Sequence, residues 1–236
     1  MSAGTLAAQA VVIAKEPVPG RVKTRLTPPF TPAEAALLAE AALADTLAAV
    51  AAAPVSRHVL ALDGAPADWL PAGFDVIPQR GGGLDERLAA AFADTHATLP
   101  LPIVLVGMDT PQLTPHLLAD AAGSLVSGEA DAVFGPATDG GFWLLGLRKP
   151  DRSLLAGVPM SRPDTGRQQI DRLTSAGLRV AMAPELTDVD TFREAELIAG
   201  TASGSRFAAA FGQAMARDGG RQGLSLLTQD IHSRQV

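Results

Sequence analysis

The sequence of 236 residues contains no cysteine. This absence excludes disulfide bonds, thiolate zinc sites, iron–sulfur clusters and cysteine nucleophiles. The four histidines, His58, His96, His116 and His232, are too scattered to indicate a zinc site. Tyrosine is absent and aromatic residues make up only 4%, so we do not expect a platform on which nucleic-acid bases stack.

The sequence also lacks an apolar run that would cross a membrane. The most apolar long stretch, residues 33–53, is interrupted by Glu34, Glu40 and Asp45. The N-terminus has neither the basic start nor the long apolar segment of a secretory signal. Acidic residues outnumber basic ones, 25 to 19, whereas nucleic-acid binders are usually basic. We therefore expect a cytoplasmic protein that binds neither membranes nor nucleic acid.

The composition that remains is that of a folded protein, with 47% hydrophobic and 19% charged residues. The length fits one large domain, or one domain with an appendage. Recognisable motifs end near residue 199, and glycine, serine and polar residues dominate beyond it. We predict a domain over residues 1–199 and a weakly packed C-terminal tail or peripheral helix over residues 200–236. The oligomeric state is not predicted.

Short apolar strands alternate with helical patterns along most of the chain. Strands are predicted at residues 11–14, 57–62, 74–77, 103–106, 130–134, 142–147 and 178–181. Helices are predicted at residues 32–53, 84–97 and 165–176, and from Pro115 and Thr191 onward. This alternation indicates an α/β three-layer sandwich with a mainly parallel mixed sheet. The strands that flank residues 139–141 are close in sequence, which allows one of them to run antiparallel.

A basic loop follows the first predicted strand. Four of the 19 basic residues fall within residues 15–25 of this acidic protein. Lysine and arginine bind phosphate groups, and Gly20 allows the backbone to approach a ligand closely. The loop lacks the glycine before the lysine of a Walker motif, and it is not a dinucleotide fingerprint. A solvated basic surface is the alternative, but the concentration of charge after a strand favours a ligand site.

Two acidic segments are candidate metal ligands. Asp109 follows the most apolar strand, where a carboxylate can hold Mg²⁺ together with water and phosphate oxygens. An aspartate that bonds its own turn is an equally good interpretation of this position. Asp188 and Asp190 alternate just before a helix whose capping box, Thr191 and Glu194, does not require them. We favour half of a metal site for this pair, because adjacent carboxylates repel one another without a cation.

A glycine-containing turn lies between two apolar strands. The sequence Asp139-Gly140-Gly141 is typical of a hairpin. The same glycines would also expose backbone N–H groups to an anionic or sugar-like substrate. Both interpretations remain open from the residues alone.

Four motifs occur together in a fixed order along residues 10–199. They are Lys-x-Pro-x-Pro-Gly-x-Val-Lys-Thr-Arg-Leu, Gly-x-Asp-Thr-Pro, Gly-Pro-x-x-Asp-Gly-Gly-Phe-Trp-Leu-Leu-Gly and Asp-Val-Asp-Thr. The combination resembles a bacterial family of unknown function with a GT-A-like fold, often labelled glycosyltransferase. That family is similar to the guanylyltransferases of deazaflavin-coenzyme biosynthesis. The chain departs from the family pattern at Asp85, where glycine is usual.

The resemblance implies a nucleotide-diphospho-sugar transferase (GT-A) fold, a nucleotide pocket and Mg²⁺. By position, it implies that Asp109, Asp188 and Asp190 are metal ligands and that Asp139, Gly140 and Gly141 lie near the acceptor. Lys15, Lys23 and Arg25 would act on the phosphates as catalytic groups. The nucleotide would lie along the loop formed by Lys15, Pro19, Gly20, Arg21, Lys23, Thr24 and Arg25.

Proteins with this fold catalyse both nucleotidyl and glycosyl transfer, so the choice between these reactions has to be argued from the residues of the site. Our hypothesis is a Mg²⁺-dependent nucleotidyltransferase that joins an NTP-derived nucleotide to a small phosphorylated or carboxylated acceptor and releases pyrophosphate. The basic loop favours it, because a triphosphate carries more charge to neutralise. The alternatives are a glycosyltransferase that uses a nucleotide sugar, and a nucleotide-binding protein without enzymatic activity.

Overall fold

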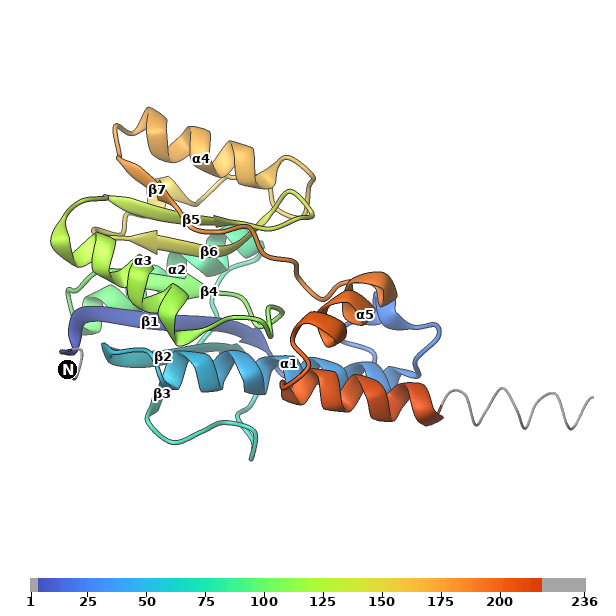
Figure 1. The fold of residues 1–236 in the computed structure, drawn as a ribbon. Helices are drawn as coiled ribbons and strands as arrows, with labels where there is room; N and C mark the ends of the chain where they lie inside the picture. The colour runs from blue at the N-terminus through green and yellow to red at the C-terminus, as the bar shows by residue number, and fades with distance from the viewer. Residues whose placement is uncertain (1–3, 218–236) are drawn as a thin grey trace, which may run out of the picture.

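A seven-stranded mixed sheet forms the centre of the molecule (Figure 1). The computed structural model describes residues 4–217. Its strands are β1 (Leu6–Lys15), β2 (Val55–Asp63), β3 (Phe74–Pro78), β4 (Ile103–Val106), β5 (Ala132–Pro136), β6 (Phe142–Leu147) and β7 (Val180–Met182). The order across the sheet is β3-β2-β1-β4-β6-β5-β7. Strand β6 runs antiparallel to β4 and β5, and the remaining pairings are parallel. The predicted mainly parallel α/β sheet is confirmed.

Helices cover both faces of the sheet, which confirms the three-layer sandwich. They are α1 (Pro32–Ala51), α2 (Leu84–Thr98), α3 (Pro115–Ser127), α4 (Thr165–Ser175) and α5 (Phe192–Thr201), with short 3₁₀ turns η1 (Thr24–Leu26) and η2 (Arg152–Leu154). Helix α1 begins at a capping box between Thr31 and Glu34, with Pro32 at the first helical position. Helix α3 likewise begins at Thr114, whose side chain accepts a hydrogen bond from the Leu117 amide, so at both helices a side chain satisfies a free backbone N–H group.

Alternate residues of the strands fill two separate cores. Val12 and Leu60 pack with residues of α1 and α3 on one face. Val11 and Val59 pack with residues of α2 on the other, beside Leu173 of α4. Strands buried on both faces are apolar at nearly every position, which is why they appear in the sequence as short continuous runs.

The sheet order reverses between β1 and β4. The chain proceeds from β1 to β2 and β3 on one side, and it resumes with β4 on the other side of β1. Ligands of open α/β sheets bind outside the carboxyl ends of strands at such a reversal. The basic loop after β1 and the acidic turn after β4 both start there.

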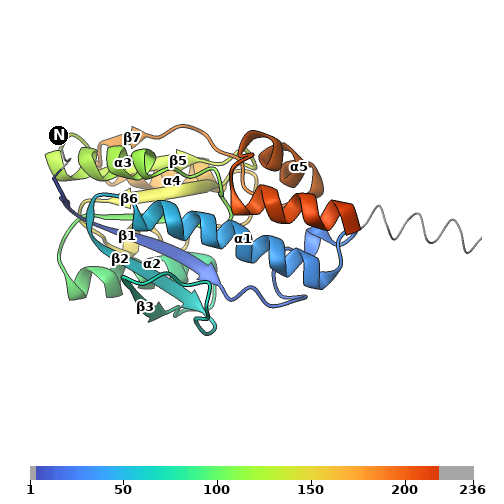
Figure 2. The same ribbon diagram turned by 60° about the horizontal axis from the view of Figure 1, so that its bottom comes forward.

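A third apolar cluster joins the C-terminal part of the described chain to α1. Residues 206–217 are helical and lie along α1 in both ribbon views (Figures 1 and 2). Phe207 is fully buried and Phe211 nearly so, in contact with a cluster that contains Leu26 and Phe30. The expectation of weak packing after residue 200 is wrong for this helix. Residues 218–236 lie outside the described part of the chain.

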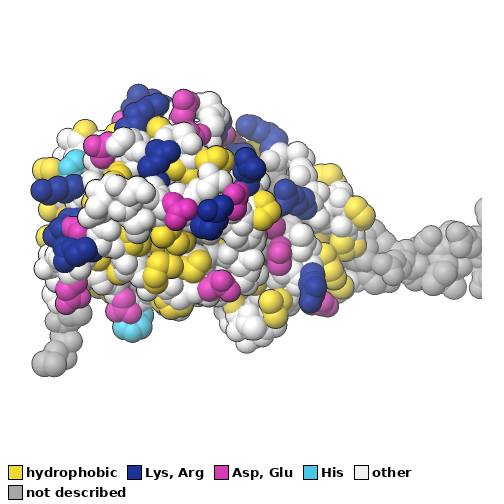
Figure 3. Space-filling view, turned by 90° about the horizontal axis from the view of Figure 1, so that it is seen from above, with side chains coloured by type: hydrophobic (Ala, Val, Ile, Leu, Met, Phe, Trp, Pro, Cys, Tyr) yellow, Lys and Arg dark blue, Asp and Glu magenta, His cyan; other side chains and the backbone are white. Residues whose placement is uncertain are grey.

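The surface above α4 carries charges of both signs. Lys and Arg side chains alternate with Asp and Glu side chains on this face (Figure 3). It therefore presents no continuous basic surface. Among residues 4–217, no helix combines the length and apolarity needed to span a membrane.

Candidate active site

A cleft of about 690 Å³ opens at the carboxyl ends of β1 and β4. Four predicted segments contribute to its wall: the basic loop, the turn after β4, the hairpin between β5 and β6, and the acidic segment before α5. The predicted residues that line it are Lys15, Arg21, Lys23, Thr24, Arg25, Asp109, Asp139, Gly141, Asp188 and Asp190. The fold thus brings both acidic segments and most of the basic loop into one cavity.

Backbone pairing brings the two acidic segments together. After β7 the chain runs beside the end of β5, where the Leu186 amide donates to the Pro136 carbonyl at 3.1 Å. It then reaches the turn after β4, where the Val189 amide donates to the Asp109 carbonyl at 2.9 Å. The positions of Asp188 and Asp190 beside Asp109 are therefore fixed by main-chain hydrogen bonds.

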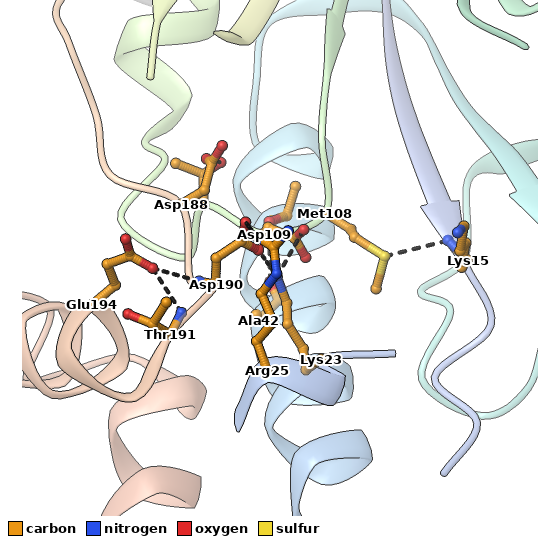
Figure 4. A network of polar contacts seen from close by, with 12 residues as sticks. Lys15, Lys23, Arg25, Ala42, Met108, Asp109, Asp188, Asp190, Thr191 and Glu194 are labelled. Atoms are coloured by element: carbon orange, nitrogen blue, oxygen red, sulfur yellow. Dashed lines mark hydrogen bonds and ion pairs between the residues drawn. The ribbon is translucent and has the colours of Figure 1, made fainter. Parts of the chain in front are cut away.

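Lys23 forms the most buried ion pairs of the cleft. Its Nζ lies 2.8 Å from Oδ2 of Asp109 and 3.2 Å from Oδ1 of Asp190, and its side chain is only 7% exposed (Figure 4). Burial lowers the pKa of the Lys23 ammonium, but the two carboxylates outweigh burial and the net pKa is raised. Asp190 also accepts a longer contact of 3.5 Å from the exposed Arg25. Lys23 is therefore a stable cation between two acidic loops.

Asp188 lies in a different environment from Asp190. Its carboxylate is directed away from Lys23 in Figure 4, and it accepts a hydrogen bond of 3.0 Å from the hydroxyl of Thr110. Burial, followed by repulsion from Asp109, raises the pKa of Asp188 to about 7. Asp188 is thus a carboxylate without a matched cation among the described residues.

The fit of a divalent cation can be tested on these oxygens. Among residues 4–217, no three or more Asp, Glu or His side chains form a ready cluster for a metal ion. Oδ1 of Asp109, however, is buried and has no hydrogen-bond partner within the described chain. Mg²⁺ commonly uses one or two carboxylates, with water and substrate phosphates as its other ligands. Asp109 and Asp188 fit that requirement, whereas Asp190 is engaged by Lys23 and Arg25.

The remaining residues of the basic loop are largely exposed. Lys15, Arg21 and Thr24 line the cleft with accessible side chains. Pro19 and Gly20 lie outside its wall. Gly20 has φ +77°, a left-handed conformation that glycine adopts readily, so this residue shapes the turn of the loop.

The glycine-containing turn is a hairpin and also part of the cleft. Asp139 and Gly141 line the cavity, while Gly140 does not. The carboxylate of Asp139 accepts a hydrogen bond of 2.8 Å from the Gly141 amide. Gly140 has φ +88°, and a Cβ there would lie 2.0 Å from the Pro163 carbonyl oxygen. Gly140 therefore permits close packing of the hairpin against the loop before α4.

The structure adds residues that the sequence motifs did not single out. Gln79 lines the cleft, and its amide donates to the carbonyls of Ala14 and Ala61. Arg162 also lines the cleft, from the loop before α4. Thr110 belongs to a motif that was noted for Asp109 alone. A buried hydroxyl beside a carboxylate gives no periodic signal, so only the fold reveals it.

A model of the family described as "Uncharacterized protein conserved in bacteria (DUF2064)" matches residues 39–162. This match extends over more than half of the chain. The chain belongs to this family. The matched region includes the turn after β4 and the hairpin, and it ends before the acidic segment at Asp188 and Asp190. No match was found among curated proteins.

One solved structure shares this architecture over nearly the whole chain. A crystal structure of a candidate nucleotide-diphospho-sugar transferase from Desulfovibrio desulfuricans is 27% identical, with a TM-score of 0.81, and the match covers 91% of this chain and 97% of that one. The 2-C-methyl-D-erythritol 4-phosphate cytidylyltransferase of Thermus thermophilus is 16% identical, with a TM-score of 0.49 and coverages of 87% and 98%. The first match identifies the fold as the nucleotide-diphospho-sugar transferase type, as the motifs implied.

Proposed function

We propose that this protein is a divalent-metal-dependent nucleotidyltransferase that transfers a nucleotide from an NTP to a small phosphorylated or carboxylated acceptor. The observation that carries the proposal is the shared cleft, in which a basic loop faces three aspartates across the carboxyl ends of β1 and β4. The likeness to a candidate nucleotide-diphospho-sugar transferase over 91% of the chain supports a transferase. Both features suit a phosphate-rich substrate.

The basic loop would bind the triphosphate. Lys15 and Arg25 are exposed at the cleft and are available to phosphate oxygens. As the acceptor oxygen attacks the α-phosphorus, the bond to the β-phosphate breaks and pyrophosphate leaves. Lysine and arginine at the leaving group stabilise the charge that develops on it. A divalent cation, Mg²⁺ in the cell, would be held by Asp109 and Asp188, and by Asp190 once Lys23 releases it. The cation would neutralise and orient the phosphates.

The acceptor would bind on the opposite side, between the hairpin and the loop before α4. Asp139 and Gly141 belong to that wall, and Arg162 supplies an exposed cation beside them. A cation there suits an acceptor that carries phosphate or carboxylate. The close packing of Gly140 against Pro163 would hold this wall in place.

Glycosyl transfer from a nucleotide sugar is the second candidate. The likeness to a candidate nucleotide-diphospho-sugar transferase favours it. In that reaction a nucleoside diphosphate leaves, and the same cation would stabilise its phosphates. We rank it second because a triphosphate carries more negative charge for the basic loop to neutralise than the diphosphate of a nucleotide sugar does.

The test is a paired screen of acceptors, once with each NTP and once with nucleotide sugars. Pyrophosphate and nucleoside diphosphate are measured in both arms, with Mg²⁺ and with EDTA. We expect metal-dependent pyrophosphate release. Turnover only with nucleotide sugars would establish the second candidate instead. Thermal shifts measured with the same ligands require no acceptor. A nucleotide that stabilises the protein but is never turned over would indicate a binding protein.

A further inference from the structure

The ammonium of Lys23 lies between two of the three carboxylates that we propose as metal ligands. Its Nζ contacts Oδ2 of Asp109 and Oδ1 of Asp190, at 2.8 and 3.2 Å. A magnesium ion bound to these two oxygens would need contacts of roughly 2.0–2.1 Å with each of them. The two cations cannot share this position, because like charges repel and the space between the loops is already filled.

The backbone holds Lys23 at this position. Its φ of 48° and ψ of 38° are left-handed, a conformation that non-glycine residues seldom adopt. The next residues form η1, whose Leu26 is fully buried in the cluster with Phe30. The local fold therefore directs the lysine inward, while Arg21 and Arg25 on the same loop are exposed.

We propose that Lys23 is an internal competitor of the divalent cation in the nucleotide-free protein. Its ammonium satisfies Asp109 and Asp190 and keeps the affinity of these carboxylates for a free metal ion low. The inference rests on the proposed function for what happens next. Arrival of a nucleotide gives the ammonium phosphate oxygens to bind, and the carboxylates are then free for the metal. Metal and nucleotide would consequently bind with positive cooperativity.

The test measures metal binding in the absence of nucleotide. Mn²⁺ serves as the probe, because the electron paramagnetic resonance signal of the free ion decreases as the ion binds to the protein. We compare the wild-type protein with Lys23→Met, which keeps an unbranched side chain one atom shorter and removes the charge. We expect Lys23→Met to bind Mn²⁺ at least about tenfold more tightly, the scale of one charge-assisted interaction lost by the competitor.

Arg21→Gln is the matched control. It removes one positive charge from the same loop and the same cleft, but Arg21 has no ion pair with Asp109 or Asp190 among the contacts of the described chain. A general electrostatic effect would strengthen Mn²⁺ binding equally in both variants. Equal gains, or no gain in Lys23→Met, would overturn the proposal.

Lys23→Met removes the ammonium from between Asp109 and Asp190, and only Asp190 keeps another cation, Arg25, so the variant is expected to lose some stability. If the variant unfolds without metal, Mn²⁺ should restore its folding at concentrations that do not stabilise the wild type. The dependence of its stability on Mn²⁺ concentration then gives its affinity for Mn²⁺. Failure of Mn²⁺ to restore folding would contradict the proposal. Turnover assays separate this result from the proposed function. If the wild type releases pyrophosphate in a metal-dependent reaction but Lys23→Met binds Mn²⁺ no more tightly, only the proposed role of Lys23 is rejected. If Lys23→Met binds Mn²⁺ more tightly but no pyrophosphate is released, only the proposed reaction is rejected.

Discussion

The backbone amide of Val189 donates a hydrogen bond of 2.9 Å to the carbonyl of Asp109. Together with the hydrogen bond from Thr110 to Asp188, this contact fixes the segment before α5 to the turn after β4. Its consequence is electrostatic, because it brings Asp188 and Asp190 close to a third carboxylate, that of Asp109. The resulting repulsion requires cations, and Lys23 supplies one of them.

Asp109→Asn should weaken metal binding and leave the fold intact. Asparagine keeps the shape of the side chain, and Lys23 retains Asp190 as its partner. Mutation of a residue that only hydrogen-bonds to a metal ligand typically lowers metal affinity roughly 10- to 100-fold. Loss of a ligand itself should lower the affinity by more than that. Calorimetric titration with Mg²⁺ and nucleotide measures this loss. Asp120→Asn is the control, since Asp120 is an exposed carboxylate on α3. Equal affinities in both variants would remove Asp109 from the metal site.

The sequence motifs predicted which segments form the cleft, but not how their charges pair. Asp109, Asp139 and the pair before α5 were recognisable as carboxylates or turns at the ends of strands. The ion pair between Lys23 and Asp109 was not predictable, because it depends on a left-handed residue and on the meeting of two loops. Periodicity and spacing describe single elements, whereas this contact arises from the order of strands in the sheet.

Gly140→Ala should disturb the acceptor wall. The new Cβ would lie 2.0 Å from the Pro163 carbonyl oxygen, so the hairpin would have to move away from the loop before α4. Gly157→Ala is a matched control, because its φ of +81° is similar and nothing lies within 4 Å of the added atom. We expect the control to lose about 1–2 kcal/mol of stability, the usual cost of a left-handed alanine. Urea titration should show a clearly larger loss for Gly140→Ala.

Phe207→Ala should destabilise the protein by about 3–5 kcal/mol, as for other fully buried aromatic side chains. From the sequence, residues 200–236 were expected to form a weakly packed tail or a peripheral helix. The structure predicts the opposite for residues 206–217, because their helix covers α1. Phe207, Phe211 and Ala214 do follow helical spacing, but their neighbours are mostly alanine and glycine, so the contrast between an apolar and a polar face is weak. Urea unfolding measures the loss, and Gln213→Ala, at an exposed position of the same helix, should change little.

The stability of the metal-free protein should depend on Asp188. Burial and Asp109 raise its pKa to about 7 in the folded state, from 3.8 when unfolded. Between pH 4 and pH 7 the Asp188 carboxyl is therefore protonated in the folded state and ionised in the unfolded state. The stability that this proton contributes is lost as pH rises from 4 to 7. Thermal unfolding in EDTA should show a decline across this window that Asp188→Asn lacks. If the difference in melting temperature between the wild type and Asp188→Asn does not change with pH, the pKa of Asp188 is not raised by folding.

Lys15→Ala should lower kcat more than it raises KM. Lys15 is exposed at the end of β1, so its removal leaves the core unchanged, and the backbone amide that contacts Met108 remains. If Lys15 binds the departing pyrophosphate, its contact strengthens as negative charge develops on the leaving group. We expect kcat to fall roughly tenfold or more, with an unchanged melting temperature. Lys149→Ala is the control. This exposed lysine follows β6, which runs antiparallel to β4, so it lies at the end of the strands away from the cleft. A rise in KM alone would mean that Lys15 binds the ground-state triphosphate and takes no part in the departure of pyrophosphate.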